Sequence, residues 1–259
     1  MRRSKTLERL RADEMASLVA LGHYHPPYIR HAAEYGFDCV WLDLEHRAMD
    51  PREIQGIMAF CHLSDIDCLI RVGYRDANKL YRYLEDGASG LMVALVSTKE
   101  DAEHIVRSTK FPPLGNRGLD AAGLDSDFFL QGDEGFAERA NRETFLVAQI
   151  ETIEAVNNAD SIAAVEGIDV LFIGWGDLSL RVKHEPGVDW TLDEVVERVA
   201  AAAAAHGKTW GAVTFDPAEM KKRNDQGARL LACTGEFIAL KNSLAEKSEE
   251  IRSTFPGRS

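Results

Sequence analysis

Short apolar runs recur along the chain, separated by segments in which apolar residues stand three or four positions apart. An apolar run of strand length, bounded by polar residues or glycine, is typical of a strand buried on both faces. Eight runs are predicted to be strands: Ser17–Gly22, Asp38–Asp43, Asp67–Val72, Ser89–Leu95, Phe145–Ile150, Ile168–Gly174, Thr209–Thr214 and Ala228–Cys233. Helical periodicity is found in Pro27–Tyr35, Pro51–His62, Asp76–Glu85, Thr98–Ser108, Leu192–His206 and Pro217–Gln226.

The alternation of strands and helices predicts an α/β fold, a single (β/α)8 TIM barrel over residues 1–259 with a long loop at about 111–143. A chain of 259 residues with 45% apolar content has the ordinary size for one such barrel. Pro51 and Pro217 suit the first turn of a helix, and each follows an Asp that can cap it. A doubly wound sheet is the weaker alternative, because no Gly-x-Gly-x-x-Gly sequence follows the first strand.

Charge and composition indicate which kinds of partner and which location to expect for the protein. The net charge of −12 is spread along the chain, which argues against nucleic acid or an anionic membrane as a partner. No apolar run approaches the roughly 18 residues of a membrane span, and none of signal-peptide length follows the basic start. The four cysteines lack metal-ligand spacing and are predicted to be free thiols: Cys39, Cys61, Cys68 and Cys233. We therefore expect a cytoplasmic protein.

Polar residues at the ends of four predicted strands carry the candidate chemistry. Glu151 follows the fifth strand and Asp177 follows the sixth, and two acids at neighbouring strand ends make a site for a hard cation. His46 follows the second strand as a candidate base, and Arg71 in the third can stabilise an anion. Each residue alone has a structural explanation, such as a helix cap or a surface ion pair. All of them are expected at the carboxyl face of one barrel, which indicates an enzyme.

Several motifs in order resemble the HpcH/HpaI family of class II pyruvate aldolases, which is related to the phosphoenolpyruvate/pyruvate-binding barrels. The resemblance extends from Gly36 to about Leu180. The matching segments are Gly36–Asp38, Asp43–His46, Arg71–Val72, Phe111–Gly118, Gln149–Thr152 and Phe172–Ser179.

The resemblance implies a role for each matching residue. Glu151 and Asp177 would bind a divalent ion, Mg²⁺, Mn²⁺ or Co²⁺, and His46 would transfer protons. The substrate would lie beside Gln149 and Arg71, and Arg117, which belongs to a matching segment, is predicted to bind it as well. Independently of the resemblance, a helix that starts after the sixth strand would offer the backbone N–H groups of Gly176, Asp177 and Leu178 to a carboxylate.

The chain departs from the family at positions that bear on the substrate. Trp175 stands where the family usually has Pro and is expected in the pocket wall. Glu85 stands where the family has an Asp behind its histidine, often from a neighbouring subunit. Acidic residues after Gly118 would repel a dicarboxylate acceptor if that loop closes over the site. Against this, the sequence after Asp177 carries basic residues that can attract an anion, although such residues more often form a solvated face: Arg181, Lys183 and His184.

The sequence therefore predicts a divalent-metal-dependent aldolase that reversibly cleaves a 4-hydroxy-2-oxo (2-keto-3-deoxy) acid to pyruvate and an aldehyde, through a metal-stabilised pyruvate enolate. An oxaloacetate decarboxylase, or another enolate-forming carbon–carbon lyase, is the alternative. A catalytically silent barrel would be favoured only if Glu151 or Asp177 were absent. The resemblance also implies a homo-oligomer, a trimer or hexamer, in which the final helix, Glu236–Arg252, is exchanged between subunits.

Overall fold

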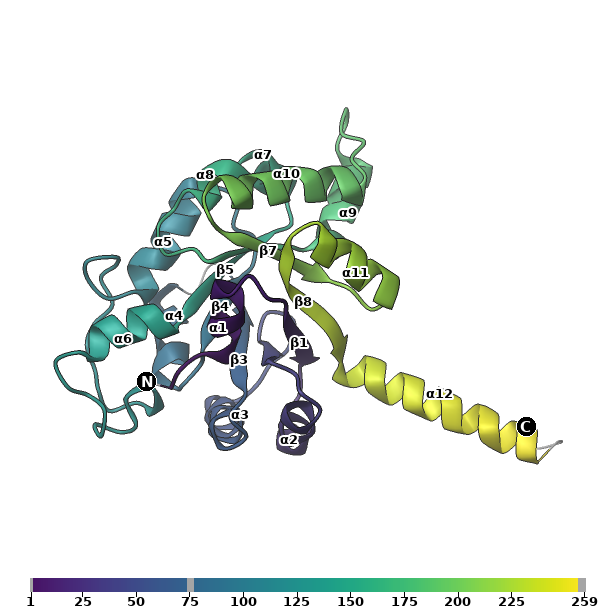
Figure 1. The fold of residues 1–259 in the computed structure, drawn as a ribbon, viewed down its shortest axis with the longest axis horizontal. Coiled ribbons are helices and arrows are strands. Elements are labelled where there is room, and N and C mark those ends of the chain that lie inside the picture. Colours follow the sequence, from purple (N-terminus) through teal and green to yellow (C-terminus); the bar gives the residue numbers. More distant parts are fainter. Residues whose placement is uncertain (1, 74–76, 256–259) are drawn as a thin grey trace.

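The computed structural model describes residues 2–73 and 77–255, except for the side chains of residues 77–79. Within these residues eight parallel strands pair in chain order, and β1 pairs with β8 to close a barrel (Figure 1). The predicted (β/α)8 fold is confirmed. The strands are β1 (Ala16–Leu21), β2 (Cys39–Asp43), β3 (Asp67–Val72), β4 (Gly90–Val93), β5 (Phe145–Ile150), β6 (Val170–Ile173), β7 (Thr209–Val213) and β8 (Ala228–Gly235).

Helices follow the strands and surround the barrel, except α1, which precedes β1, and α12, which extends away from the barrel. They are α1 (Lys5–Arg11), α2 (Pro26–Glu34), α3 (Pro51–Leu63), α4 (Ala77–Glu85), α5 (Lys99–Thr109), α6 (Phe136–Glu143), α7 (Ile153–Asn157), α8 (Ala159–Ala163), α9 (Trp175–His184), α10 (Leu192–Ala205), α11 (Pro217–Asp225) and α12 (Glu236–Thr254), with a 3₁₀ turn η1 at Leu124–Ser126. The predicted start of α4 at Asp76 lies outside the described residues. The segment 111–143, predicted as a loop, contains η1 and α6.

Local sequence signals set several helix starts. Asp50 caps α3, and the side chain of Glu53 accepts the N–H of Asp50 in return, which completes a capping box. Thr98 and Thr191 begin α5 and α10 in the same way. Such caps satisfy backbone N–H groups that the first helical turn leaves without partners. The helices therefore begin at defined residues beside the strand ends.

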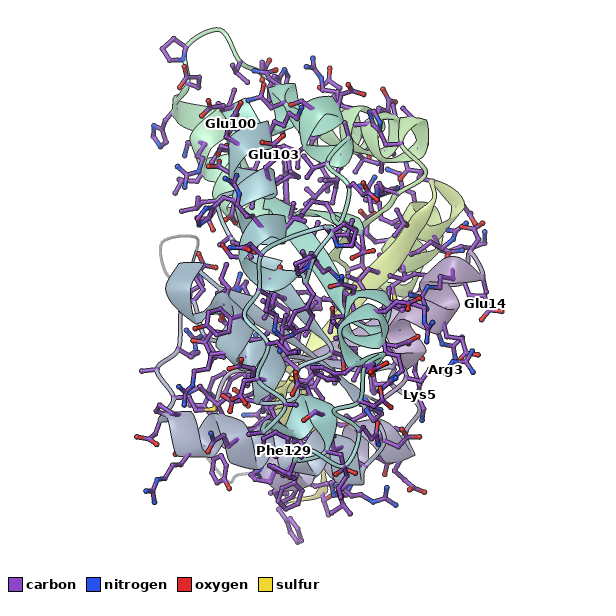
Figure 2. All side chains as sticks on the ribbon, turned by 90° about the vertical axis from the view of Figure 1, so that its left-hand side faces the viewer. Arg3, Lys5, Glu14, Glu100, Glu103 and Phe129 are labelled. Carbon is purple, nitrogen blue, oxygen red and sulfur yellow. The ribbon has the colours of Figure 1, made fainter. Side chains whose placement is uncertain are left out.

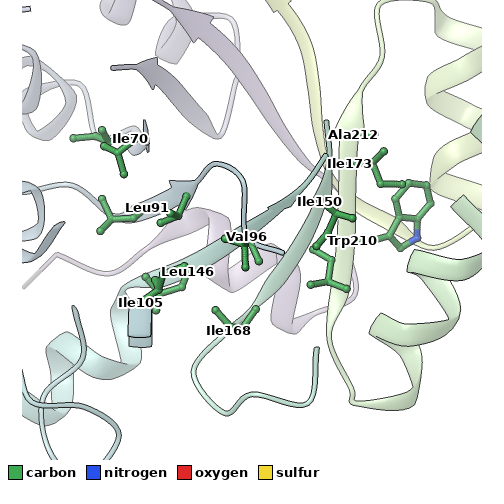
Figure 3. Close-up of a cluster of buried hydrophobic side chains, with 14 of the residues drawn as sticks. Ile70, Leu91, Val96, Ile105, Leu146, Ile150, Ile168, Ile173, Trp210 and Ala212 are labelled. Carbon is green, nitrogen blue, oxygen red and sulfur yellow. The ribbon is translucent and has the colours of Figure 1, made fainter. Parts of the chain in front are cut away.

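Two apolar layers hold the barrel together. The outer layer lies between strands and helices and includes Ile70, Leu91, Ile150 and Trp210 (Figure 3). The inner layer fills the barrel with alternate strand residues and with Leu7 of α1. Side chains in a strand alternate between its two faces. A polar residue two positions beyond an inner-layer residue therefore also points into the barrel.

The surface carries two apolar features beside its charged residues. Phe129, in the segment between β4 and β5, is 67% exposed (Figure 2). Helix α12 extends away from the barrel, and none of its residues is buried. No helix among the described residues is long and apolar enough to span a membrane. All four cysteines are free, as predicted, and Cys233 is only partly buried.

Candidate active site

Inward-facing residues at the carboxyl ends of the strands meet around one cavity of about 330 Å³. Arg71 and Gln149 lie two positions beyond the inner-layer residues Leu69 and Val147, so strand alternation turns them inward. The cavity is lined by these two side chains and by the start of α9, namely Trp175, Gly176 and Asp177. The structure thus brings five of the predicted site residues, these two and the three from α9, to one cavity.

Asp43 fixes the guanidinium of Arg71. The two residues are direct neighbours in the register of β2 and β3. Arg71 Nε donates to Asp43 Oδ1 at 3.0 Å and Nη2 donates to Oδ2 at 2.8 Å. Burial raises the pKa of Asp43, but the paired Arg71 and the backbone N–H groups of His46 and Glu45 outweigh it and lower that pKa. The Arg71 guanidinium also lies 4.9 Å from the ring centroid of Trp41. Arg71 is therefore held in one orientation.

Glu45 adds a carboxylate that the sequence motif places beside His46. Its Oε2 lies 3.3 Å from Arg71 Nε and 3.7 Å from His46 Nε2. Burial raises the pKa of Glu45, and the charges of Asp43 and Asp177 add to this, whereas Arg71 and His46 oppose it. The Oε2 atom is buried and makes no hydrogen bond within the described part of the chain. The imidazole of His46 is exposed to solvent at the rim.

Glu151 is held in place by its neighbours. Its Oε1 accepts the N–H of Leu95 at 2.8 Å, and its Oε2 accepts from Gln149 Nε2 at 2.7 Å. Leu95 adopts a left-handed backbone with φ of 57°, which is uncommon outside glycine and directs its N–H to the carboxylate. Burial raises the pKa of Glu151; the Leu95 hydrogen bond lowers it, and the charges of Glu45 and Asp177 raise it further.

The start of α9 forms the wall beside Glu151. Gly174 leaves no room for a side chain, since a Cβ there would lie 2.7 Å from Glu151 Oε2. The N–H groups of Gly176 and Asp177 belong to the first turn, outside the intrahelical bonds. The prediction for Leu178 needs correction: its N–H donates to Gly174 O at 3.1 Å and its side chain is buried, because the helix is already established there.

This donor set suits a divalent cation. Glu151 and Asp177 interact electrostatically with each other and with Glu45. The buried Oε1 of Gln149 makes no hydrogen bond to any described residue. Carboxylate and amide oxygens are ligands that Mg²⁺ and similar hard ions prefer, and Mg²⁺ is often held by one or two carboxylates with water and substrate. Among the described residues no group of three or more His, Cys, Asp and Glu side chains is arranged to hold a metal. Two carboxylates plus non-protein ligands are the arrangement that fits.

Two predicted site residues, Arg117 and Glu85, lie away from this cavity. Arg117 is buried, pairs with Asp125 at 2.7 Å and stacks on the ring of Phe111 at 4.5 Å. Glu85 lines a different cavity, next to Asp120. Burial raises the pKa of Glu85, while Arg117 opposes that rise. Neither side chain lines the cavity of Asp177 in the same chain.

Sequence reasoning missed three contributors to the site. The bidentate role of Asp43 was detectable, since it has the same strand parity as Trp41 and pairs in register with Arg71. The N–H of Leu95 was not detectable, because the identity of an apolar residue does not predict a left-handed backbone. The third contributor is the wall made by the segment after β7 and by α11, which includes Phe215, Glu219 and Arg223.

Residues 18–240 match the model of the HpcH/HpaI aldolase/citrate lyase family, and the chain belongs to that family. It is 30% identical over 257 residues to a hydroxypyruvate/pyruvate aldolase of Pseudomonas aeruginosa, covering 97% of this chain and 94% of the relative. It is 33% identical to a 4-hydroxy-2-oxovalerate aldolase of Novosphingobium aromaticivorans over 214 residues, 80% of this chain and 79% of that one.

A solved structure of an HpcH/HpaI aldolase from Desulfitobacterium hafniense DCB-2 superposes with a TM-score of 0.90, at 31% identity and with 98% of each chain covered. The family predicted from the motifs is confirmed. The prediction of an enzyme, a carbon–carbon lyase of the pyruvate aldolase class, is confirmed as well.

Proposed function

We propose that the protein reversibly cleaves a 4-hydroxy-2-oxo acid to pyruvate and an aldehyde with a divalent cation bound by Glu151 and Asp177. The observation that carries this proposal is one cavity lined by Asp177, Gln149 and the fixed Arg71, with Glu151 bonded to Gln149 beside it. The named relatives are aldolases that act on pyruvate, hydroxypyruvate or 4-hydroxy-2-oxovalerate.

Aldolases of this family generally depend on a divalent metal. Here Glu151 and Asp177 would hold Mg²⁺, Mn²⁺ or Co²⁺. When bound, such an ion supplies positive charge that stabilises the negative charge developing on the 2-oxo oxygen.

The chain's own residues divide the remaining work. Arg71 directs N–H groups toward the 2-oxo oxygen, while Asp43 keeps the guanidinium from rotating. The first-turn N–H groups of Gly176 and Asp177 bind the substrate carboxylate. Trp175 and Gln149 form the walls that orient the chain of the substrate.

His46 manages the protons at the rim. In cleavage it accepts the proton of the 4-hydroxyl group, directly or through water. The C3–C4 bond then breaks, its electron pair enters the enolate of pyruvate, and the aldehyde leaves. The protonated His46 then returns its proton to C3, directly or through water, which completes pyruvate and restores the base. Glu45 Oε2 lies 3.7 Å from His46 Nε2, so its charge stabilises the protonated imidazole.

We infer that the working enzyme is a homo-oligomer, a trimer or hexamer, in which Glu85 of a neighbouring subunit supports His46. Glu85 lies outside the cavity of its own chain, which supports a role at the cavity of a neighbouring subunit. The exposed α12 is the element that would be exchanged.

The test is to follow three reactions with chelated and metal-restored protein. These are exchange of the pyruvate methyl protons in deuterated water, aldol cleavage of a 4-hydroxy-2-oxo acid, and decarboxylation of oxaloacetate. We expect exchange and cleavage to vanish on chelation and to return with Mn²⁺ or Mg²⁺. Full activity of protein verified to be metal-free would refute the metal role, and turnover of oxaloacetate alone would make the protein a decarboxylase.

A second measurement tests the other aldolase mechanism, in which a lysine forms a Schiff base with pyruvate. No lysine is found among the described residues that line the cavity. Lys110 is buried elsewhere and donates to the carbonyls of Asn141 and Thr144. Treatment with pyruvate and borohydride should therefore leave no adduct, and a reduced pyruvyl-lysine in the mass spectrum would favour a Schiff base.

A further inference from the structure

The cavity has a second side that the proposed function does not yet use. The end of β7, the segment that follows it and α11 form this side, with Val213, Phe215, Glu219 and Arg223 in the lining. Trp175 lines the same cavity from the start of α9. Because pyruvate is seated by the residues of β3, β5 and α9, the second side is the place for the aldehyde.

Arg223, the cationic side chain on this second side, is already ion-paired within the chain. Arg223 is buried and lies 2.6 Å from both Glu219 Oε1 and Asp193 Oδ1. It also donates to Gln226 Oε1 at 2.8 Å. Lys222 bonds to both oxygens of Asp193, so two cations and two carboxylates balance. A substrate anion could recruit Arg223 only by breaking ion pairs that keep the buried guanidinium satisfied.

No other cation among the described lining residues compensates. Arg71 is bonded to Asp43 through two N–H groups and faces Glu45. The net charge of the chain, −12, further disfavours the approach of anions. An aldehyde bearing a carboxylate or sulfonate would therefore lose hydration without gaining a counter-charge.

The rest of this side is apolar and partly aromatic. Phe215 is 56% exposed, Val213 is 41% exposed, and both border the cavity. An exposed aromatic ring at the mouth of a cavity is a contact surface that a ligand can cover. Rings favour stacked or edge contacts with other rings. Phe215 and Trp175 thus offer two aromatic surfaces to a flat apolar group.

We propose that the aldehyde substrate is uncharged and carries an aromatic or other apolar group, and that Phe215 determines this preference. This inference rests on the proposed function, because it assigns the second substrate of the same site.

The first test varies the charge of the aldehyde on one benzaldehyde frame; the methyl ester differs in size from the free carboxylate by a single methyl group. Aldol addition of pyruvate is measured with benzaldehyde, 4-formylbenzoate and methyl 4-formylbenzoate. We expect kcat/KM for the methyl ester to exceed that for the free carboxylate by about tenfold or more. Equal values, or a preference for 4-formylbenzoate, would overturn the inference.

The second test varies the ring of the protein. Phe215→Ala should lower the ratio of kcat/KM for benzaldehyde to that for acetaldehyde by about tenfold, since only the larger aldehyde covers the ring. Phe215→Tyr keeps the ring and should preserve the ratio. Phe60→Ala, which removes an exposed ring on the outer helix α3, is the matched control. An unchanged ratio in Phe215→Ala would show that Phe215 does not determine specificity.

Proton exchange of pyruvate tests the proposed aldolase function separately from the aldehyde preference, because exchange needs no aldehyde. Exchange together with a preference for charged aldehydes leaves the proposed function intact and overturns the inference. Absence of both exchange and addition with every aldehyde refutes the proposed function, and the inference falls with it.

Discussion

Three carboxylates at the rim differ in how their charge is balanced. Asp43 has a bidentate partner in Arg71, and its pKa is lowered. Glu45 is partly buried and Glu151 is buried, each beside other acids, and their pKa values are raised. Burial of like charges without a full counter-charge opposes folding, and it is typical of sites that bind a cation or do chemistry.

These raised pKa values make cation binding sensitive to acid. Protonation competes with metal, and a raised carboxyl pKa lets it compete at a higher pH than the usual value of about 4.3 for Glu. On acidification, we expect Mn²⁺ affinity to fall at a higher pH than the pH at which an ordinary carboxylate becomes protonated. Glu45→Gln removes a charge that raises the pKa of Glu151, so the loss should move to lower pH. Mn²⁺ titrations by electron paramagnetic resonance across pH check this.

The exposed Glu154 on α7 supplies the control for that titration. Glu154→Gln makes the same chemical change outside the cavity and should leave the profile where it is. A Glu45→Gln profile that coincides with the unsubstituted one would show that the two carboxylates do not interact as described.

Arg71 should be needed for both halves of the reaction. Arg71→Ala removes a preorganised donor beside the developing charge, which typically costs about 10²–10³ in rate. Pyruvate proton exchange and aldol cleavage should both fall by that factor. Arg71→Lys should not restore them, because an ammonium cannot reproduce the two bonds of the guanidinium to Asp43. Unchanged exchange and cleavage in Arg71→Ala would refute this role.

His46 should affect bond cleavage and leave ligand binding in place. His46→Ala should keep pyruvate and Mn²⁺ affinity, because its imidazole is outside the proposed ligand set. Loss of the proton acceptor should slow cleavage by about 10²–10⁴. Calorimetry gives the two affinities and stopped-flow assay gives the rate; cleavage at the unsubstituted rate would assign the proton transfer to another group.

At the scale of elements, the junction of β6 and α9 determines the geometry of the site. A Cβ at Gly174 would lie 2.7 Å from Glu151 Oε2 and 2.9 Å from Gln149 Nε2. Gly174→Ala should therefore displace Glu151 and weaken Mn²⁺ binding by about ten- to a hundredfold, a typical cost of disturbing the support of a ligand. Calorimetric titration measures the affinity, and circular dichroism verifies the fold.

Gly118→Ala is the matched control for this junction, since a Cβ at Gly118 meets nothing within 4 Å. It should leave Mn²⁺ affinity unchanged. Equal affinities for Gly174→Ala and the unsubstituted protein would mean that Glu151 does not need its present position.

The elements were predictable because buried parallel strands are short apolar runs, and each predicted strand overlaps an observed one. Four strands, β1, β4, β6 and β7, end one or two residues earlier than predicted. β4 stops at Val93, and Leu95 turns into the left-handed region to bind Glu151. Helix α6 was missed within a segment rich in Gly and Asp, where local composition favours turns.

The site was predictable where strand order and parity decide it, as for Arg71 and Gln149. Leu178 shows the limit, because one residue along a helix decides whether an N–H is free or bonded. The wall formed by Phe215 and Arg223 shows another limit. The i, i+4 spacing of Glu219 and Arg223 is visible in the sequence of α11, but nothing there reveals that Asp193 of α10 also pairs with Arg223.

At the scale of the molecule, no residue of α12 is buried; Phe237 at its start packs edge-on against His23, and the rest of the helix extends away from the barrel. Its exposed residues Phe237, Leu240, Leu244 and Ile251 are spaced by three, four and seven positions, which places them on one face of the helix. An exposed apolar stripe of this kind marks an interaction surface. Together with the family resemblance, it supports packing of α12 on another copy of the chain.

Disrupting this face should therefore change the mass of the assembly. Leu240→Lys with Leu244→Lys places two charges on the apolar face and should convert a trimer or hexamer into smaller species, measured by light scattering after size exclusion. Asn242→Lys with Ala245→Lys adds the same charge to α12 outside the apolar face and should leave the mass unchanged. If Glu85 serves a neighbouring subunit, aldol cleavage should fall with the mass of the first variant and persist in the second. A monomeric unsubstituted protein with full activity would contradict both the exchange of α12 and the role of Glu85 across subunits.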